Sequence, residues 1–364
     1  MEMISDEELV ALAERNSSFS KTSLGVQIGW DATSLELVKT CPYKYYLSMI
    51  RGYRAKKGNV DLFFGLIVHS SLELYHHKRA EGLTYEEAVR EVLKFALIKT
   101  GKHVNEVYLK CSACDREWTE KADRIPEICS NCKSTNSFFA VQDKATVWYP
   151  WESDDKNKTR YTLIRSLVWY LEQFKSDPAE TVILENGKPA VELSFRMEIP
   201  LINPDGDPYL LSGHLDRLVR FGGSIFVTDV KSTKTTLNSD WFKKYMMDNQ
   251  MSMYSTASKV VLKERAVGII LDAIQVAVTF TRCLRGFVKR TPGQLDEWLE
   301  DTMFWIKQAE GFAARRHWPM NDTSCNKYGK CVFRDNVCSK DPSVRPKFLD
   351  THFRKETWDP LKSR

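Results

Sequence analysis

Two residues in the second half of the chain have the types and the spacing needed to hydrolyse a phosphodiester bond. Asp229 and Lys231 lie two positions apart at the end of the apolar run Ser224–Asp229, which is predicted to be a strand entering a turn. Side chains two positions apart on a strand point to the same face of the sheet. Such hydrolysis needs a carboxylate to hold a metal ion and a cation beside the attacking water or the scissile phosphate.

A second carboxylate and an imidazole extend this candidate site. Asp216 falls on the preceding predicted strand, so its carboxylate and that of Asp229 can converge on one hard cation such as Mg²⁺ or Mn²⁺. His69 would add an imidazole ligand, which moves the preference towards Mn²⁺. Each residue also has a simpler explanation: His69 could pack in the core, and Asp216 could pair with Arg217 or Arg220.

Four short stretches in chain order resemble the motifs of the RecB-family branch of the PD-(D/E)XK nuclease superfamily. They are G-x-x-x-H at Gly65–His69, G-x-x-D at Gly213–Asp216, D-x-K at Asp229–Lys231 and Q-x-x-x-Y at Gln250–Tyr254. The resemblance covers residues 31–338 apart from a middle insert. It implies a restriction-endonuclease-like α/β fold, in which a mixed sheet is flanked by helices.

The resemblance also implies a role for each matched residue. The metal ligands would be His69, Asp216, Asp229 and the backbone carbonyl of Val230, and Lys231 would be the catalytic lysine. Gln250 and Tyr254, on the helix that follows, would contact DNA or orient the lysine. Glu73 lies one helical turn after His69 and would contact the ligands rather than the metal ion.

Nine cysteines indicate metal binding rather than disulfides in a chain expected to be intracellular. One set of four has the spacing of two zinc knuckles separated by fourteen residues: Cys111, Cys114, Cys129 and Cys132. We expect these thiolates to hold Zn²⁺ in a zinc ribbon inserted at about residues 104–140. The ribbon would contact nucleic acid or a partner, or would only staple a long insert.

The second set of four joins one early cysteine to three late ones: Cys41, Cys325, Cys331 and Cys338. It resembles the iron–sulfur staple of AddB-type and CRISPR-adaptation nucleases, which implies a [4Fe–4S] cluster clamping the two ends of the domain together. The C-x₅-C-x₆-C spacing here is wider than the usual C-x₂-C-x₅-C, and four thiolates can also hold Zn²⁺. The ninth cysteine, Cys283, is expected to be a buried free thiol.

The composition is that of a globular protein, with 43% hydrophobic and 28% charged residues among 364. No apolar run approaches the ~20 residues of a membrane span, and the acidic N-terminus lacks a secretory segment, so we expect a cytoplasmic protein without membrane contact. The net charge is only +5, but residues 39–57 hold basic side chains without acids, interleaved with tyrosines. They are Lys39, Lys44, Arg51, Arg54, Lys56 and Lys57, with Tyr43, Tyr45, Tyr46 and Tyr53. This stretch fits phosphate contact and base stacking, or a solvated helix with tyrosines in the core.

The hydrophobic periodicity predicts helices first and strands later. Helices are expected at 31–49 (with Ser34 as N-cap and a break or a second helix start at Pro42), 62–80, 86–98, 159–174 and 241–262, and one that opens with a capping box at Thr291 and runs to about Arg315. Strands are expected at 191–201, 209–219, 224–229 and 267–278. We predict an N-terminal helical part at 1–103, the ribbon at 104–140, a nuclease core at 141–340 and a basic tail at 341–364.

The leading hypothesis is a metal-dependent deoxyribonuclease, an exonuclease that acts on or generates single-stranded DNA in recombination, repair or CRISPR adaptation. Phage recombination exonucleases resemble it as well. The chain has no G-x-x-x-x-G-K-[ST] motif, so a helicase or recombination protein would be a separate partner. Two alternatives remain: a DNA-binding or assembly module that uses the nuclease fold as a scaffold, and RNA as the substrate.

Overall fold

The computed structural model describes residues 20–56, 59–121, 128–135, 138–140, 145–150, 155–262, 266–326 and 330–358. Lys57 and the acidic N-terminal residues lie outside these ranges. In the part of the chain that is described, no helix is both long enough and apolar enough to cross a membrane.

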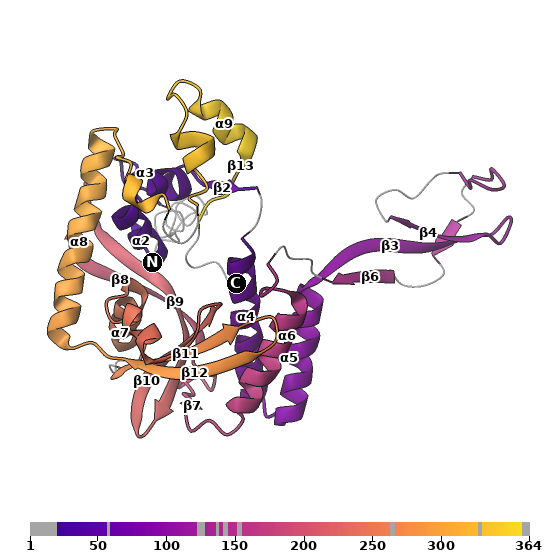
Figure 1. Ribbon diagram of the computed structural model, residues 1–364, viewed down its shortest axis with the longest axis horizontal. Helices are drawn as coiled ribbons and strands as arrows, with labels where there is room; N and C mark the ends of the chain where they lie inside the picture. Colours follow the sequence, from indigo (N-terminus) through magenta and orange to yellow (C-terminus); the bar gives the residue numbers. More distant parts are fainter. Residues whose placement is uncertain are drawn as a thin grey trace, which may run out of the picture.

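A mixed sheet forms the centre of the molecule (Figure 1). Its strands follow in the order β1, β9, β10, β11 and β12, and β7 and β8 also pair with β9. The bounds are β1 Gly29–Trp30, β7 Glu180–Thr181, β8 Val191–Ile202, β9 Pro208–Phe221, β10 Ser224–Thr233, β11 Gly268–Val276 and β12 Thr281–Val288. Strand β1 is parallel to β9 and β10 is parallel to β11, whereas the other pairs are antiparallel. The predicted mixed sheet flanked by helices is therefore confirmed.

Helices cover both faces of this sheet. One hydrophobic cluster joins the sheet to α2 Ala32–Thr40, α7 Asn249–Leu262 and α8 Pro292–Ala314, through Leu35, Met251 and Ile306. A second cluster joins it to α4 Val60–Ala80, α5 Tyr85–Lys99 and α6 Arg160–Gln173. Val227 of β10 belongs to the first cluster and Val230 to the second. Because side chains alternate along a strand, residues three apart serve opposite faces.

The expected helices agree with the structure except in two places. Asp31, not Ser34, is the N-cap of α2: its carboxylate accepts from Ser34 N, and the Ser34 hydroxyl forms the other half of the capping box. The predicted helix at 241–262 is two elements, the 3₁₀ helix η2 Ser239–Tyr245 and α7. The second begins where it does because the carboxylate of Asp248 accepts from Gln250 N and Met251 N.

Pro42 starts a new helix as expected, because proline needs no hydrogen-bond acceptor at the first helical position. This helix, α3 Pro42–Tyr45, continues into the π-helix η1 Tyr46–Ile50. The capping box at Thr291 opens α8 as predicted, and α8 ends at Ala314.

Strand β10 differs from its prediction in length. It runs to Thr233, so Asp229 and Lys231 lie inside the strand and not at a turn. Both residues pair with β11, opposite Leu271 and Ala273. The parallel partner strand supplies the backbone hydrogen bonds that keep this part of β10 extended.

The two ends of the described chain meet beside the sheet. Strand β2 Tyr53–Ala55 pairs with β13 Phe353–Lys355, which follows α9 Arg345–His352, so residues up to 358 of the predicted tail include a helix and a strand. A cluster that includes Leu47, Phe333 and Leu349 packs between them. The short helices η3 Asp322–Ser324 and η4 Arg334–Cys338 connect α8 to this region.

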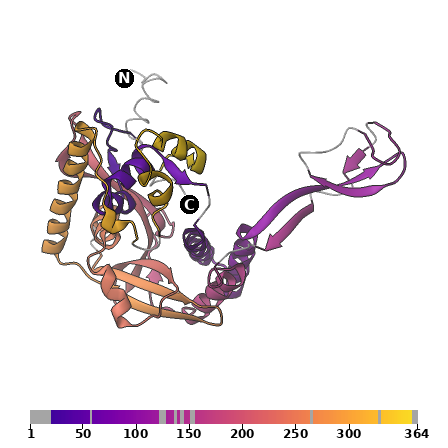
Figure 2. The same cartoon turned by 45° about the horizontal axis from the view of Figure 1, so that its top comes forward.

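The insert forms its own sheet. Its strands are β3 Gly101–Cys111, β4 Glu117–Lys121, β5 Phe138–Ala140 and β6 Ala145–Pro150, with β3 paired to each of the other three. Figures 1 and 2 show β3 extending away from α4, α5 and α6 and carrying the cysteine loops at its far end.

Candidate active site and cysteine centres

Four elements bring the predicted catalytic residues together. His69 comes from α4, Asp216 from β9, Asp229 and Lys231 from β10, and Gln250 from α7. One ligand atom from each of His69, Asp216 and Asp229 lies within 4.8 Å of the others. These three residues are separated by up to 160 positions in the chain, so the sheet and α4 produce the site only when the whole domain has folded.

The charges in this cluster fit a cation. His69 Nδ1 lies 2.9 Å from Asp216 Oδ2. Burial alone would lower the pKa of His69, but the charge of Asp216, a hydrogen bond to it and the charge of Asp229 raise it. Burial raises the pKa of Asp229 to about 7; the charge of Lys231 opposes this rise and that of Asp216 adds to it. Two buried carboxylates in contact repel each other, and a bound metal ion would neutralise them.

The lysine is held by a short series of hydrogen bonds. Lys231 Nζ lies 3.0 Å from Asp229 Oδ1 and donates to Gln250 Oε1 at 2.6 Å. Gln250 Nε2 donates to the hydroxyl of Tyr254 at 2.7 Å, and that hydroxyl donates to Asp216 Oδ1 at 3.5 Å. Gln250 and Tyr254 lie one helical turn apart on α7, so the helix positions both at once. The series joins the lysine back to the carboxylate of Asp216.

A sequence comparison decides which family this site belongs to. The model of the PD-(D/E)XK nuclease superfamily matches residues 30–338, most of the chain. The chain belongs to the PD-(D/E)XK nuclease superfamily. Membership implies nuclease activity, DNA as the substrate and a divalent metal ion at the site.

Solved structures and curated sequences add little to this assignment. A protein from Eubacterium rectale, named as a candidate exonuclease, is 10% identical with a TM-score of 0.44, and the match covers 95% of this chain and 98% of that one. SSO0001 is 19% identical with a TM-score of 0.23, over 38% of this chain and 56% of that one. No curated protein matches the chain.

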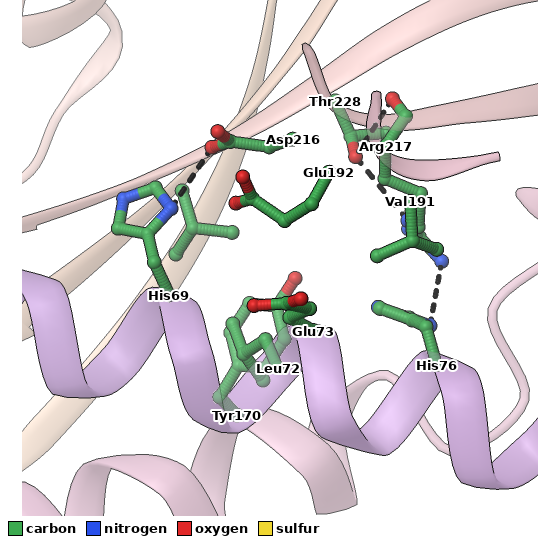
Figure 3. Close-up of a pocket in the computed structure, with 11 residues that line it drawn as sticks. His69, Leu72, Glu73, His76, Tyr170, Val191, Glu192, Asp216, Arg217 and Thr228 are labelled. Atoms are coloured by element: carbon green, nitrogen blue, oxygen red, sulfur yellow. Dashed lines mark hydrogen bonds and ion pairs between the residues drawn. The ribbon is translucent and has the colours of Figure 1, made fainter. Parts of the chain in front are cut away.

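Behind the catalytic cluster, the nuclease has a small cavity of about 30 Å³ (Figure 3). His69 and Glu73 project into it from α4, as expected for residues one turn apart, and Glu192 of β8 points between Asp216 and Glu73. Glu192 has a φ of +48°, a conformation that costs a residue with a Cβ about 1 kcal/mol or more. No motif in the sequence marks Glu192, a single glutamate in a strand.

Lys158 is a second residue that the sequence did not reveal. It is fully buried at the start of α6, where its ammonium donates to Ser232 Oγ at 2.9 Å and lies 4.0 Å from the ring centre of Phe64. Burial lowers its pKa to about 8. Ser232 directly follows Lys231, so Lys158 supports β10 from the α4 side.

Arg217, which the simpler explanation paired with Asp216, contacts other residues instead. Arg217 Nε donates to Thr228 Oγ1 at 3.2 Å, and its Nη1 lies 3.2 Å from Nδ1 of His76. Figure 3 shows this pair at the opposite end of the cavity from His69. Arg217 therefore leaves the carboxylate of Asp216 directed toward His69.

The first cysteine set is gathered as a compact site. The ligand atoms of Cys111, Cys114, Cys129 and Cys132 all lie within 4.8 Å of one another. The Sγ atoms of Cys111 and Cys132 are 3.7 Å apart, and those of Cys114 and Cys129 are 3.8 Å apart. In a tetrahedral site with metal–sulfur bonds of about 2.3 Å, sulfurs lie about 3.8 Å apart. The geometry fits one metal ion bound by four thiolates.

The second set is more widely spaced. Within the described residues, three or more possible ligands come within 4.8 Å of each other only in the ribbon and in the catalytic cluster, so this set is not among them. The four cysteines nevertheless lie near one another. Burial raises the pKa of Cys338 to about 12, and three neighbouring thiols add to the rise: Cys331, Cys41 and Cys325. Cys283 is buried on β12, as expected, and burial raises its pKa to about 12.

The basic and aromatic stretch at 39–57 supports both of its interpretations. Tyr45 and Tyr53 are buried in the core, as the simpler explanation predicts. Tyr43 and Tyr46 are half-buried, and Arg51 is exposed beside them. Of these four tyrosines, only Tyr43 and Tyr46 are available to a ligand.

Proposed function

We propose that this protein is a Mg²⁺- or Mn²⁺-dependent deoxyribonuclease of the RecB-family branch. The observation that carries the proposal is the convergence of His69, Asp216 and Asp229 within 4.8 Å, with the ammonium of Lys231 3.0 Å from Asp229. These three side chains and the carbonyl of Val230 would hold the metal ion. The donor set of two carboxylates, one imidazole and a carbonyl suits Mn²⁺ or Mg²⁺.

The protein's own groups would divide the work of hydrolysis. A bound divalent ion supplies a water of lowered pKa and neutralises charge on the phosphate. Lys231 would hold its ammonium beside the attacking oxygen or the scissile phosphate, where negative charge grows in the transition state. Gln250 fixes the ammonium from one side and Asp229 from the other, so little reorganisation is needed during the reaction. Glu73 would support the ligands from the cavity behind them.

The finer assignments belong to the same proposal. The protein would be an exonuclease that acts on or generates single-stranded DNA in recombination, repair or CRISPR adaptation, beside a separate helicase or recombination protein. Its units would be 1–103, 104–140, 141–340 and 341–364. The ribbon would hold Zn²⁺, which the sulfur distances near 3.8 Å support. The wider second set would hold a [4Fe–4S] cluster, whose several irons separate the thiolates farther than a single ion does.

Mn²⁺-dependent digestion of end-labelled DNA tests the proposal, using linear and circular substrates in single-stranded and duplex forms. Lys231→Ala should lower the cleavage rate about 10²–10³-fold, because it removes one preorganised electrostatic contact. Lys243→Ala is the matched control, since it removes the same charge at an exposed position on η2. It should cleave like the wild type. Full activity in Lys231→Ala, or none in the wild type with both cysteine centres loaded, would contradict the proposal.

Asp229→Asn tests the metal site separately from the lysine. The amide keeps the shape of the side chain but removes the charge that holds the cation, so cleavage should be lost while the melting temperature and DNA binding stay close to wild type. Mn²⁺ should raise the melting temperature of the wild type but not of Asp229→Asn. A variant that still cuts DNA would show that Asp229 is not a metal ligand.

A further inference from the structure

The structure contains a groove of about 780 Å³ that the catalytic site does not use. It lies between α3 with η1 and the segment that follows α8, and Arg345 at the start of α9 closes one side. Figure 1 shows α3 close to the end of α8 and to α9. We propose that this groove binds single-stranded DNA at a position separate from the point of cleavage.

Aromatic rings form one wall of the groove. Trp318, Tyr46 and Tyr43 are stacked in a row, with centroids 5.5 Å apart for the first two and 6.3 Å for the second two. Trp318 is buried and supports the row, whereas the two tyrosines are half-buried. Leu24 and Met320 expose apolar surface at the rim. Such a row offers flat faces on which unpaired bases stack in any sequence.

Cationic side chains form the rest of the lining. They are Lys21, Arg51, Arg316 and Arg345, with His317 beside them, and no acidic residue is among the described residues that line the groove. Arg51 Nη1 donates to the hydroxyl of Tyr46 at 3.0 Å, and Arg345 lies 5.9 Å from the ring centre of Tyr43. Arg51 and Arg345 are therefore each held next to a ring of the row. This alternation of charge and ring matches a strand in which phosphates and bases alternate.

The cations are crowded enough to repel one another. Burial lowers the pKa of Lys21, and the charges of Arg51 and Lys355 lower it further. Lys21 Nζ donates to the carbonyl of Ile50, which keeps it at the groove despite this repulsion. A polyanion would relieve the repulsion, and counterion release would add to its affinity.

Arg316 occupies a position that its backbone does not favour. It follows the last turn of α8 with a φ of +52°, where helices commonly end on glycine. Its guanidinium is exposed and makes no hydrogen bond or ion pair with any residue that the structure describes. The left-handed backbone would accept glycine at this position, so the end of the helix does not require the arginine side chain. Substitution of Arg316 should therefore change ligand binding without disturbing the fold, unlike substitution of the other groove residues.

Single-stranded DNA is the occupant that these features favour. Paired bases present only their edges and cannot stack on a row of tyrosines, so a duplex would use the cations alone. The choice of DNA rests on the proposed nuclease function, whereas the stacking and charge arguments do not. The groove would hold the strand that leads to or from the active site.

Fluorescence anisotropy with a labelled oligothymidylate of about 20 nucleotides tests the groove, with site sizes of about 4–16 nucleotides as the guide to length. Full-length protein in the Asp229→Asn background is used so that the probe is not digested. Arg316→Gly should weaken binding about three- to tenfold and reduce the salt slope by about 0.7, as for one lost phosphate contact. Its melting temperature should be unchanged or higher, because glycine suits the left-handed backbone.

Arg90→Ala is the charge control, since Arg90 is exposed on α5 far from the groove in the chain, and it should bind like the parent. Tyr46→Leu should weaken binding about tenfold through lost stacking, whereas Tyr46→Phe should keep most of the affinity. A duplex of the same length should bind more weakly and lose less in Tyr46→Leu. Unchanged affinity in both Arg316→Gly and Tyr46→Leu, or equal losses for duplex and single strand, would overturn the proposal. Cleavage by the wild type is scored separately, so failure of the groove and failure of the nuclease are distinguishable.

Discussion

The two cysteine sets show two ways of using thiols in one chain. The ribbon set is local: its four residues span 22 positions, and its sulfurs lie 3.7 and 3.8 Å apart in two pairs. The other set joins Cys41 to three residues near position 330 and is more open. A local site can fold its own segment, whereas a long-range site can only form once the core has brought both ends together.

The surroundings of the two sets differ in the same way. The ribbon lies at the far end of β3, away from the helices that cover the sheet (Figures 1 and 2). Cys331 and Cys338 instead pack against the cluster that holds β2 and β13 together. We therefore expect the ribbon metal to matter only to the insert, and the second centre to matter to the whole domain.

Cys331→Ser should have the largest effect. A cross-link that closes a loop of this length is worth about 4 kcal/mol or more in the chain-entropy model, and the substitution removes one of its four anchors. At about 2–4 °C per kcal/mol for a large domain, the melting temperature should fall by about 8–16 °C. Thermal denaturation followed by circular dichroism, with iron and zinc contents measured in parallel, checks this.

Cys283→Ser is the control for Cys331→Ser, because Cys283 is a buried thiol outside both sets. Its substitution should cost only about 1 kcal/mol and leave both metal contents unchanged. If Cys331→Ser melts no lower than Cys283→Ser and keeps its metal, the second set is not a staple.

Cys114→Ser should have a smaller and local effect. It opens the tetrahedral site, so one zinc per chain should be lost and the insert should become sensitive to protease. The free energy of unfolding of the nuclease core should change by no more than about 0.5 kcal/mol, as expected for a change remote from the core. Limited proteolysis measures the protease sensitivity of the insert, and calorimetry measures the stability of the core. A large loss of core stability would mean that the ribbon packs on the core, and the contrast between the two sets would fail.

The smallest predicted effect is a difference in reactivity between one thiol of each set, Cys132 and Cys338, in the metal-free protein. Hydrogen bonds from Ser134 lower the pKa of Cys132 to about 6, whereas burial raises that of Cys338 to about 12. The thiolate is the nucleophile, so Cys132 should react with iodoacetamide at pH 7 and slow down as the pH falls below about 6, while Cys338 stays protonated. Mass spectrometry of the labelled peptides reads this out. Equal labelling of both at pH 7 would show that their surroundings do not differ.

Local signals in the sequence predicted the fold well where one short segment decides the structure. The Thr291 capping box marked the start of α8, the change to a strand pattern marked β8 and β9, and an apolar run marked the first part of β10. Prediction failed where a single side chain redirects the backbone. Asp248 starts α7 by capping it, which periodicity alone cannot detect inside an apparently continuous helix. Strand β12, missed entirely, is too mixed in character to show as a strand before its partner β11 is known.

The residues of the candidate site likewise fall into two groups: those that the sequence predicted and those that it did not. His69, Asp216, Asp229 and Lys231 were found because their motifs lie in a fixed order, and the structure brings them together. Glu192 and Lys158 were not found, because nothing in the neighbouring sequence marks them. Their positions depend on how α4, α6 and β8 pack, which is information that only the assembled fold contains.

The hydrogen bonds from Lys231 through Gln250 and Tyr254 to Asp216 have a direction. An ammonium can only donate and a carboxylate can only accept, so every group between them must accept on one side and donate on the other. A glutamate at position 250 would break this polarity at neutral pH, although it has the same shape as glutamine. The position therefore tolerates a narrower range of residues than its size would allow, and relatives that differ there should also have changed the residue at position 254.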